Sequence, residues 1–164
     1  LQNGVNMLGD IIDRAYAKGM RIILNPSPFD RELEKCDLSK VFLFMVNEIE
    51  GRLLAGQGYE NETDGIRLID GILKKYDAAQ VVLTMGSEGA FYGSGSKRYY
   101  QKCFPVKAVD TTAAGDTFAG YFVYGLLKGD TVEKNMEIAA KAAAISVSKK
   151  GAVPSIPEMA EISG

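Results

Sequence analysis

The sequence predicts an α/β protein in which a mostly parallel sheet lies between two layers of helices, a three-layer α/β/α arrangement. Two observations lead to this prediction. Short, continuously apolar runs alternate with amphipathic segments of helical period, which is typical of parallel strands that are buried on both faces. Polar or glycine-containing turns follow the apolar runs, where a parallel sheet usually binds its ligands. The parallel strands are expected over residues 20–24, 41–46 and 81–84.

The helices are predicted from apolar residues that recur at intervals of three and four. The first helix is expected over residues 5–16, because apolar side chains share one face there and Gly19 ends the pattern. The last helix should begin with a capping box formed by Asp130 and Glu133. This last helix is expected over residues 132–148, and the others over residues 48–55, 64–76 and 116–127.

A small antiparallel hairpin is expected within residues 89–102, after the third parallel strand. Its strands are rich in apolar and aromatic residues, and Gly-Ser-Gly-Ser at 93–96 supplies the turn. The sequence contains no internal repeat and no linker, so we expect residues 1–164 to form a single α/β domain.

The composition is that of an ordinary globular protein, with 46% apolar and 24% charged residues. The net charge of -2 argues against nucleic acid as a partner, because sequence-independent binding needs a basic excess. No apolar run approaches the roughly 18 to 20 residues of a membrane helix. No secretory leader opens the chain, and only Cys36 and Cys103 are present. These features predict a cytoplasmic protein with reduced thiols.

Histidine is absent from the sequence. Its absence excludes Ser-His-Asp and Cys-His catalysis and any His-ligated zinc site. Proton transfer must therefore depend on carboxylates, Lys, Tyr or Cys.

The segment 110–118 combines a run of small residues with an aspartate at the start of a predicted helix. Backbone N–H groups at a helix N-terminus are unpaired and favour an anion such as phosphate. The side chains of Ala113, Ala114 and Gly115 are too small to cover these N–H groups, and Asp116 could take a proton from an alcohol. Phosphoryl transfer to a hydroxyl requires these parts. Asp116 suits the role of a simple N-cap equally well, so both interpretations stay open at this point.

Two further motifs follow predicted strands. Asn47 and Glu50 are spaced so that both could reach one hydrated Mg²⁺, although a polar helix start explains the same pair. The loop 84–89 holds two glycines and could wrap a nucleotide, but it matches neither a Walker loop nor the dinucleotide fingerprint. The segment 149–155 is typical of a helix C-terminus that glycine closes.

Taken in order, these motifs resemble the ribokinase-like, or PfkB, family of carbohydrate kinases over essentially the whole chain. The segment 110–118 is similar to the family's second signature, in the Ala-Ala form of its ribokinase branch. The resemblance implies the ribokinase-like fold and ATP-dependent phosphorylation of a hydroxyl on ribose or a related carbohydrate. The other segments that follow the family pattern are 25–28, 47–50, 84–89, 109–112 and 150–155.

The resemblance also implies roles for individual residues. Asp116 is implied as the base, and the N–H groups of Ala113, Ala114 and Gly115 as the anion hole. Asn47 and Glu50 are implied to help position Mg²⁺ and the phosphates. The implied contacts of ATP are Asn47, Gly115, Ala140 near the adenine, and the loop residues Thr84, Met85, Gly86, Ser87, Glu88 and Gly89. The implied ligands of a monovalent cation, usually K⁺, are Asp110, Ser155 and the backbone carbonyls of Thr112, Ser146, Lys149 and Gly151.

Only the C-terminal half of the family pattern is present, without the sugar-contacting residues and the lid. We therefore expect a nucleotide-binding half that is inactive alone and whose uncovered strand edge beside residues 20–24 favours a homo-oligomer. The acceptor stays open within the family and includes fructose, a phosphorylated sugar, a keto-deoxy sugar acid and a nucleoside. A non-catalytic nucleotide-binding or assembly module is the alternative from a different class.

Overall fold

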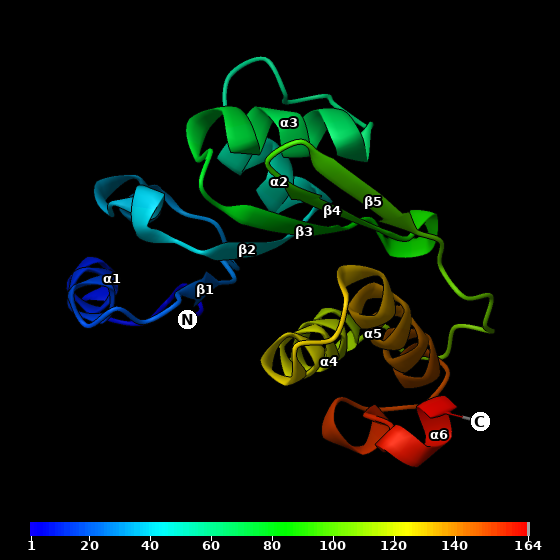
Figure 1. Ribbon diagram of the computed structural model, residues 1–164. Helices are drawn as coiled ribbons and strands as arrows, with labels where there is room; N and C mark the ends of the chain where they lie inside the picture. The colour runs from blue at the N-terminus through cyan, green and yellow to red at the C-terminus, as the bar shows by residue number, and fades with distance from the viewer. Residues whose placement is uncertain (164) are drawn as a thin grey trace. The chain divides into compact units, whose positions relative to one another are not determined.

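The computed structural model describes residues 1–163 and confirms the predicted α/β class (Figure 1). Its sheet has five strands in the order β1-β2-β3-β4-β5. β1, β2 and β3 pair in parallel, and their register places Asn47 opposite Thr84. Two of the loops singled out in the sequence therefore leave the sheet side by side. The strands are β1 (Ile23–Leu24), β2 (Leu43–Asn47), β3 (Gln80–Thr84), β4 (Ala90–Ser94) and β5 (Lys97–Gln101).

β4 and β5 form the predicted antiparallel hairpin, because a two-residue connection joins neighbouring strands only in opposite directions. The predicted turn at 93–96 was too long: Gly95 and Ser96 make the turn, whereas Gly93 lies inside β4. A Cβ at Gly93 would lie 2.2 Å from Cγ2 of Ile69, so packing and not a turn requires glycine there. Gly95 has a φ of 51° and supplies the conformation that the turn needs.

Three helices accompany the parallel strands: α1 (Leu8–Ala17), α2 (Glu48–Ala55) and α3 (Gly65–Lys75). α2 and α3 lie side by side over one face of the sheet (Figure 1). Burial of their apolar residues explains why a spacing of three and four predicted these helices. The fully buried side chains of this core include Phe44, Leu54, Leu68, Ile72 and Leu83.

The first parallel strand is shorter than predicted, because only Ile23 and Leu24 of residues 20–24 pair in the sheet. Met20 is 59% exposed, and its backbone N–H donates to the carbonyl of Ala15. Gly19, with a φ of 70°, allows this turn at the end of the helix. The apolar run therefore contains a helix end as well as a strand.

The edge of the sheet beside β1 is partly covered, which differs from the open edge that was predicted. A parallel bridge pairs Gln2 with Asn25, and the N–H of Asn25 donates to the carbonyl of Leu1 at 2.9 Å. The terminal ammonium of Leu1 donates to the carbonyl of Ile23 at 2.7 Å. Residues 1–3 thus satisfy backbone groups at this edge, and homo-oligomer formation stays a prediction.

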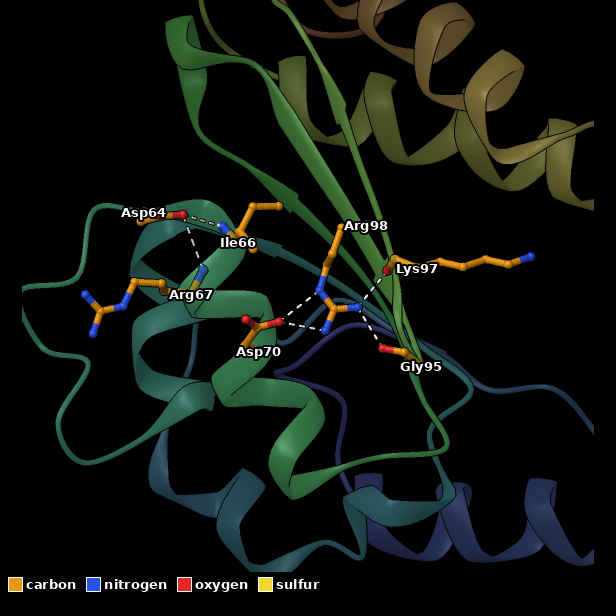
Figure 2. Close-up of polar contacts among 7 residues, drawn as sticks. All are labelled: Asp64, Ile66, Arg67, Asp70, Gly95, Lys97 and Arg98. Carbon is orange, nitrogen blue, oxygen red and sulfur yellow. Dashed lines mark hydrogen bonds and ion pairs between the residues drawn. The ribbon is translucent and has the colours of Figure 1, made fainter.

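Arg98 on β5 attaches the hairpin to α3 (Figure 2). Its Nε and Nη2 atoms lie 2.9 Å and 2.6 Å from Oδ1 of Asp70. Its Nη1 atom donates to the carbonyls of Gly95 at 2.7 Å and Lys97 at 2.6 Å. One guanidinium therefore holds the hairpin turn and the helix together. The cap of that helix is Asp64, which accepts hydrogen bonds from two N–H groups of the first turn.

The C-terminal part of the chain is helical. α4 (Ala114–Lys128) packs against α5 (Val132–Val147), and α6 (Met159–Ser163) follows a short 3-10 turn, η4 (Val153–Ser155). The capping box predicted for Asp130 and Glu133 was wrong. Thr131 occupies the N-cap position of α5 and accepts from the N–H of Lys134, while Asp130 pairs with the Lys134 ammonium at 2.8 Å. The cap lies one residue later than the acidic pattern suggested.

The chain divides into two compact units. The first contains Leu1–Met85 and Phe91–Tyr99, and the second contains Gly86–Ala90 and Tyr100–Gly164. The single domain expected over residues 1–164 stays a prediction, and its last residue, Gly164, lies outside the described residues.

Residues 1–163 include both cysteines and all the described helices. Cys36 and Cys103 are both free thiols, as predicted. None of the helices in this part of the chain combines the length and the apolar character needed to cross a membrane.

Candidate functional site

Asp116 is the third residue of α4 and lies inside its first turn. The helix begins at Ala114, two residues earlier than predicted. Its N-cap residue is Ala113, which has a left-handed backbone, with φ 63° and ψ 9°, and makes no side-chain cap bond. The interpretation of Asp116 as a simple N-cap is therefore wrong, because a backbone turn starts this helix in place of a capping side chain.

The N-terminus of α4 keeps backbone donors available. The N–H of Thr117 donates to the carbonyl of Ala113 at 2.8 Å, and the N–H of Ala114 donates to Thr111 at 3.3 Å. No acceptor within residues 1–163 faces the N–H groups of Gly115 and Asp116. A left-handed residue followed by right-handed ones forms a concave set of N–H groups, and the helix dipole adds positive potential. This geometry suits an anion, with Gly115 and Asp116 as the free donors.

The carboxylate of Asp116 is exposed and has no hydrogen-bond or ion-pair partner among the described residues. It borders a cavity of about 460 Å³, which is also lined by Thr117, Gly120, Tyr121, Tyr124, Ile156 and Met159. A Cβ at Gly120 would meet nothing within 4 Å, so the cavity stays open along the helix. The side chain is thus accessible to a small molecule and is not used to hold the fold together.

Asp110 connects this segment with the turn that follows α5. Its Oδ1 atom accepts the N–H of Thr112 and its Oδ2 atom accepts the N–H of Gly151, both at 2.9 Å. The backbone N–H groups of Val109 and Asp110 donate to the carbonyl of Val147. Hydrogen bonds from the side chain and backbone of Thr112, and then from Gly151, lower the pKa of the Asp110 carboxyl below its ordinary value.

The residues implied as cation ligands gather around the same turn. Besides the bond from Gly151 to Asp110, the hydroxyl oxygens of Ser146 and Ser155 lie 2.8 Å apart. Lys149 was implied through its carbonyl, and its ammonium pairs with Glu161 at 2.6 Å. Carbonyl and hydroxyl oxygens can replace the hydration shell of K⁺, and a single carboxylate suits its single charge. The donor set therefore fits a monovalent cation.

Asn47 and Glu50 form a capping box at the start of α2. The Asn47 side chain accepts the N–H of Glu50 at 2.9 Å, and Oε2 of Glu50 accepts the N–H of Asn47 at 3.0 Å. Glu50 is 5% exposed. The pair therefore has the structural role of a polar helix start, and contact with Mg²⁺ stays a prediction. No group of three or more Cys, Asp or Glu side chains in residues 1–163 is arranged to hold a metal ion.

The loop 84–89 is fixed by the hairpin that follows it. Gly86 and Gly89 both have positive φ values, of 53° and 103°. A Cβ at Gly89 would lie 2.3 Å from the carbonyl oxygen of Gln101, so only glycine fits there. The hydroxyl of Tyr100 donates to the carbonyl of Glu88 at 2.8 Å. The loop has a defined shape, and its residues from Gly86 onward belong to the second unit, as do half-buried Ala140 and exposed Asp116.

Sequence reasoning missed two features of this region. One is the left-handed backbone of Ala113, which residue preferences do not predict for alanine. The other is Thr117, whose buried hydroxyl donates to Ser146 across the α4–α5 interface. The only signal in the sequence was a threonine in one apolar helix and a serine in the other, and their spacing does not predict that the two side chains meet.

Known proteins resemble this chain in sequence. A family model described as pfkB family carbohydrate kinase matches residues 4–159. Ribokinase of Haemophilus influenzae is 35% identical over 97% of this chain and 50% of its own length. Deoxyribokinase of Salmonella typhi is 34% identical over 86% of this chain and 46% of its own length. The chain spans about half the length of the curated relatives that it matches.

Solved structures resemble the chain in fold. Ribokinase of Thermotoga maritima is 26% identical, with a TM-score of 0.81 over 99% of this chain and 54% of its own. Ribokinase of Arabidopsis thaliana, complexed with ribose and ATP, is 28% identical, with a TM-score of 0.82 over 99% of this chain and 53% of its own. These likenesses confirm the ribokinase-like fold that the motifs implied. Together with the family match over residues 4–159, they establish that the chain belongs to the pfkB family of carbohydrate kinases.

Proposed function

We propose that this chain carries the nucleotide-binding and base-bearing part of a kinase that transfers a phosphoryl group from ATP to a sugar hydroxyl. The observation that supports it best is the unpartnered carboxylate of Asp116, one residue after Gly115 at a helix N-terminus with free N–H donors. Family membership and relatives named ribokinase give independent support. Ribose is the first acceptor to consider, since the Arabidopsis thaliana structure was complexed with ribose and ATP.

In the proposed mechanism, the carboxylate of Asp116 and the backbone N–H groups at the start of α4 have separate tasks. Asp116 accepts the proton of the attacking hydroxyl, which raises the nucleophilicity of its oxygen. The N–H groups of Gly115 and Asp116, with Ala113 shaping the turn, stabilise negative charge on the transferring group. Phosphoryl transfer depends on positioning and on charge stabilisation more than on covalent chemistry. Removal of one such donor typically costs about 10²- to 10³-fold in rate.

Two cations complete the proposal. Glu50 and Asn47 would hold Mg²⁺ through water or through the atoms that the capping box leaves free, since this ion keeps several waters. When bound, Mg²⁺ neutralises charge on the nucleotide phosphates. Asp110 and the turn 151–155, which the Gly151 N–H joins, would hold K⁺, and Asp110 precedes the anion site in the same segment of the chain.

The acceptor and the activity of the isolated chain are separate proposals. Deoxyribose is an alternative acceptor, since a deoxyribokinase is 34% identical, and the other acceptors of the family stay open. We propose that the chain alone does not turn over, because it spans only half of its relatives and nothing then orients the acceptor. The alternative from a different class is a non-catalytic module that binds a nucleotide or serves as an assembly surface.

Calorimetric titration of the chain with a non-hydrolysable ATP analogue tests the nucleotide site. Binding is expected with Mg²⁺ and K⁺ present, and weaker binding is expected when either ion is withheld. Replacing the C-terminal half of Haemophilus influenzae ribokinase with residues 1–164 tests the kinase reaction. Turnover of ribose by this chimera supports the enzyme, whereas analogue binding without turnover of any sugar supports the non-catalytic module.

A further inference from the structure

Three hydroxyl groups are buried together at the interface between α4, α5 and η4. Thr117 is 3% exposed, and Ser146 and Ser155 are both fully buried. The Thr117 hydroxyl lies 3.4 Å from that of Ser146, and the Ser146 hydroxyl lies 2.8 Å from that of Ser155. The Ser155 hydroxyl lies 2.6 Å from the carbonyl oxygen of Ala152. Hydroxyl groups this deep need partners, and these three supply one another.

The direction of the hydrogen bonds in this chain of hydroxyls is determined. A hydroxyl has one proton to donate and two lone pairs to accept with. A carbonyl oxygen can only accept, so Ser155 must use its proton on Ala152. Ser146 is therefore the donor to Ser155, and Thr117 is the donor to Ser146. The order runs from Thr117 through Ser146 and Ser155 to the carbonyl of Ala152, and it leaves one lone pair of Ser155 unused.

The chain of hydroxyls connects two segments that bear on the proposed reaction. Thr117 directly follows Asp116 in the first turn of α4. At the other end, Ala152 directly follows Gly151, whose N–H donates to Asp110 at 2.9 Å. Gly151 has a φ of 91°, so the backbone there makes a turn that an ordinary residue does not favour. The carbonyl of Ala152 in this turn accepts two bonds from Ser155, one from its N–H at 3.1 Å and one from its hydroxyl.

We propose that Thr117 and Ser146 are positioning residues, which act through Ser155 to hold the turn 151–155 against Asp110. Their hydrogen bonds keep the Ser155 proton on Ala152 and leave the Ser155 oxygen able to accept. That oxygen belongs to the donor set that fits a monovalent cation, so this part of the inference rests on the proposed function. Without Ser146, the Ser155 hydroxyl loses its fixed orientation, and the turn loosens.

Amide hydrogen exchange followed by NMR tests the positioning role without any ligand. In Ser146→Ala we expect the amides of Gly151 and Ser155 to exchange about tenfold faster, the effect of losing about one hydrogen bond. The amide of Val82 in β3 should not change. Ser148→Ala is the matched control, because its hydroxyl donates to Ile145 at 2.7 Å and lies outside the chain of hydroxyls. Unchanged exchange at Gly151 and Ser155 would overturn the proposal.

A second pair of variants covers the case in which Ser146→Ala does not fold. Thr117→Val keeps the shape of the side chain but removes the donor, whereas Thr117→Ser keeps the donor. We expect faster exchange at Gly151 in Thr117→Val and restoration of the wild-type rate in Thr117→Ser. Equal exchange in both variants would show that Thr117 only fills space, and would overturn its positioning role.

Binding of the non-hydrolysable ATP analogue, measured as K⁺ is titrated, tests the link to the cation. Ser146→Ala should need about tenfold more K⁺ for half-maximal binding, with affinity at saturating K⁺ unchanged. An unaltered K⁺ requirement, beside altered exchange, would overturn the link to the cation. If the wild-type chain does not bind the analogue, the proposed function fails with that link, and hydrogen exchange alone decides the positioning role.

Discussion

Asp110 and Gly151 are joined by a hydrogen bond of 2.9 Å between the Gly151 N–H and Oδ2 of the carboxylate, 41 residues apart in the chain. The same carboxylate accepts the N–H of Thr112 through its other oxygen. One side chain therefore fixes the segment before α4 and the turn after α5 relative to each other. The contact joins the segment that leads to the proposed anion site with the turn that belongs to the proposed cation site.

Acid should weaken the fold partly through Asp110. Because its pKa is lowered in the folded protein, its contribution to stability is complete above the ordinary aspartate pKa of about 3.9. The contribution is lost as the pH falls through the lower pKa of the folded state. Urea unfolding from pH 7 to pH 2 should show Asp110→Asn less stable than wild type at neutral pH, and a difference that shrinks in acid. Asp77→Asn, in an exposed turn, is the control. A difference independent of pH would contradict the prediction.

The left-handed backbone of Ala113 predicts a stabilising substitution. A φ of 63° places its Cβ close to the following carbonyl, which typically costs about 1 to 2 kcal/mol for a residue other than glycine. Ala113→Gly removes this strain but gives the unfolded chain more freedom, so we expect a net gain of up to about 1 kcal/mol in the free energy of unfolding.

Ala114→Gly is the matched control for this substitution. Ala114 has a helical backbone as the first residue of α4, so glycine there should cost about 0.5 to 1 kcal/mol. Urea unfolding of both variants measures the contrast. Equal loss of stability in the two would mean that Ala113 carries no strain.

The sequence predicted those parts of the fold that depend on local chemistry. The start of α2 was predicted at its observed residue, because Asn47 and Glu50 satisfy each other's N–H groups over three residues. The start of α4 was misplaced by two residues, because Ala113 begins it with an unusual backbone and no capping side chain. Acidic residues at 130 and 133 likewise suggested a cap that Thr131 provides.

Contacts between segments that lie far apart in the chain could not be predicted from the sequence. Gly93 looked like part of a turn, but the closeness of Ile69 explains it. The residues implied around the cation were brought together by the bond between Gly151 and Asp110 and by the buried hydroxyls, which no local pattern encodes. The family resemblance predicted these residues, whereas the spacing of apolar residues predicted the helices.

Gly125 on α4 faces Asn135 on α5 so closely that alanine does not fit. A Cβ at Gly125 would lie 2.0 Å from Oδ1 of Asn135. Asn135 is 1% exposed, and this oxygen has no hydrogen-bond partner within residues 1–163. Gly125→Ala should therefore lower the free energy of unfolding by about 1 to 3 kcal/mol, the usual cost of overpacking.

Two variants test the cause of that loss. Gly120→Ala, on the same helix with open space around its Cβ, should be neutral or stabilise by up to about 1 kcal/mol. Asn135→Ala should relieve the clash, so Gly125→Ala should cost less in that background than in wild type. Additive losses in the double variant would count against a steric cause.

Arg98 should contribute more to stability than its ion-pair partner Asp70. The pair is partly exposed, and such pairs are usually worth about 0.2 to 1 kcal/mol. Arg98 also donates to the carbonyls of Gly95 and Lys97, which Asp70→Asn leaves intact. We expect Arg98→Ala to cost about 1 to 2 kcal/mol and Asp70→Asn less than 1 kcal/mol. Urea unfolding at low and high salt measures both, and only the Asp70 effect should disappear in salt.

Asp116→Asn separates the proposed base from the proposed nucleotide site. The substitution keeps the shape of the side chain and the free N–H groups of α4, but asparagine cannot accept the proton. Turnover of ribose by the chimera should fall by about 10²- to 10⁴-fold, the usual contribution of a general base. Affinity for the non-hydrolysable ATP analogue should be unchanged or higher, because a negative charge beside the phosphates is lost. Turnover within tenfold of the unsubstituted chimera would remove Asp116 from the role of base, whereas loss of analogue binding would place it in the nucleotide site instead.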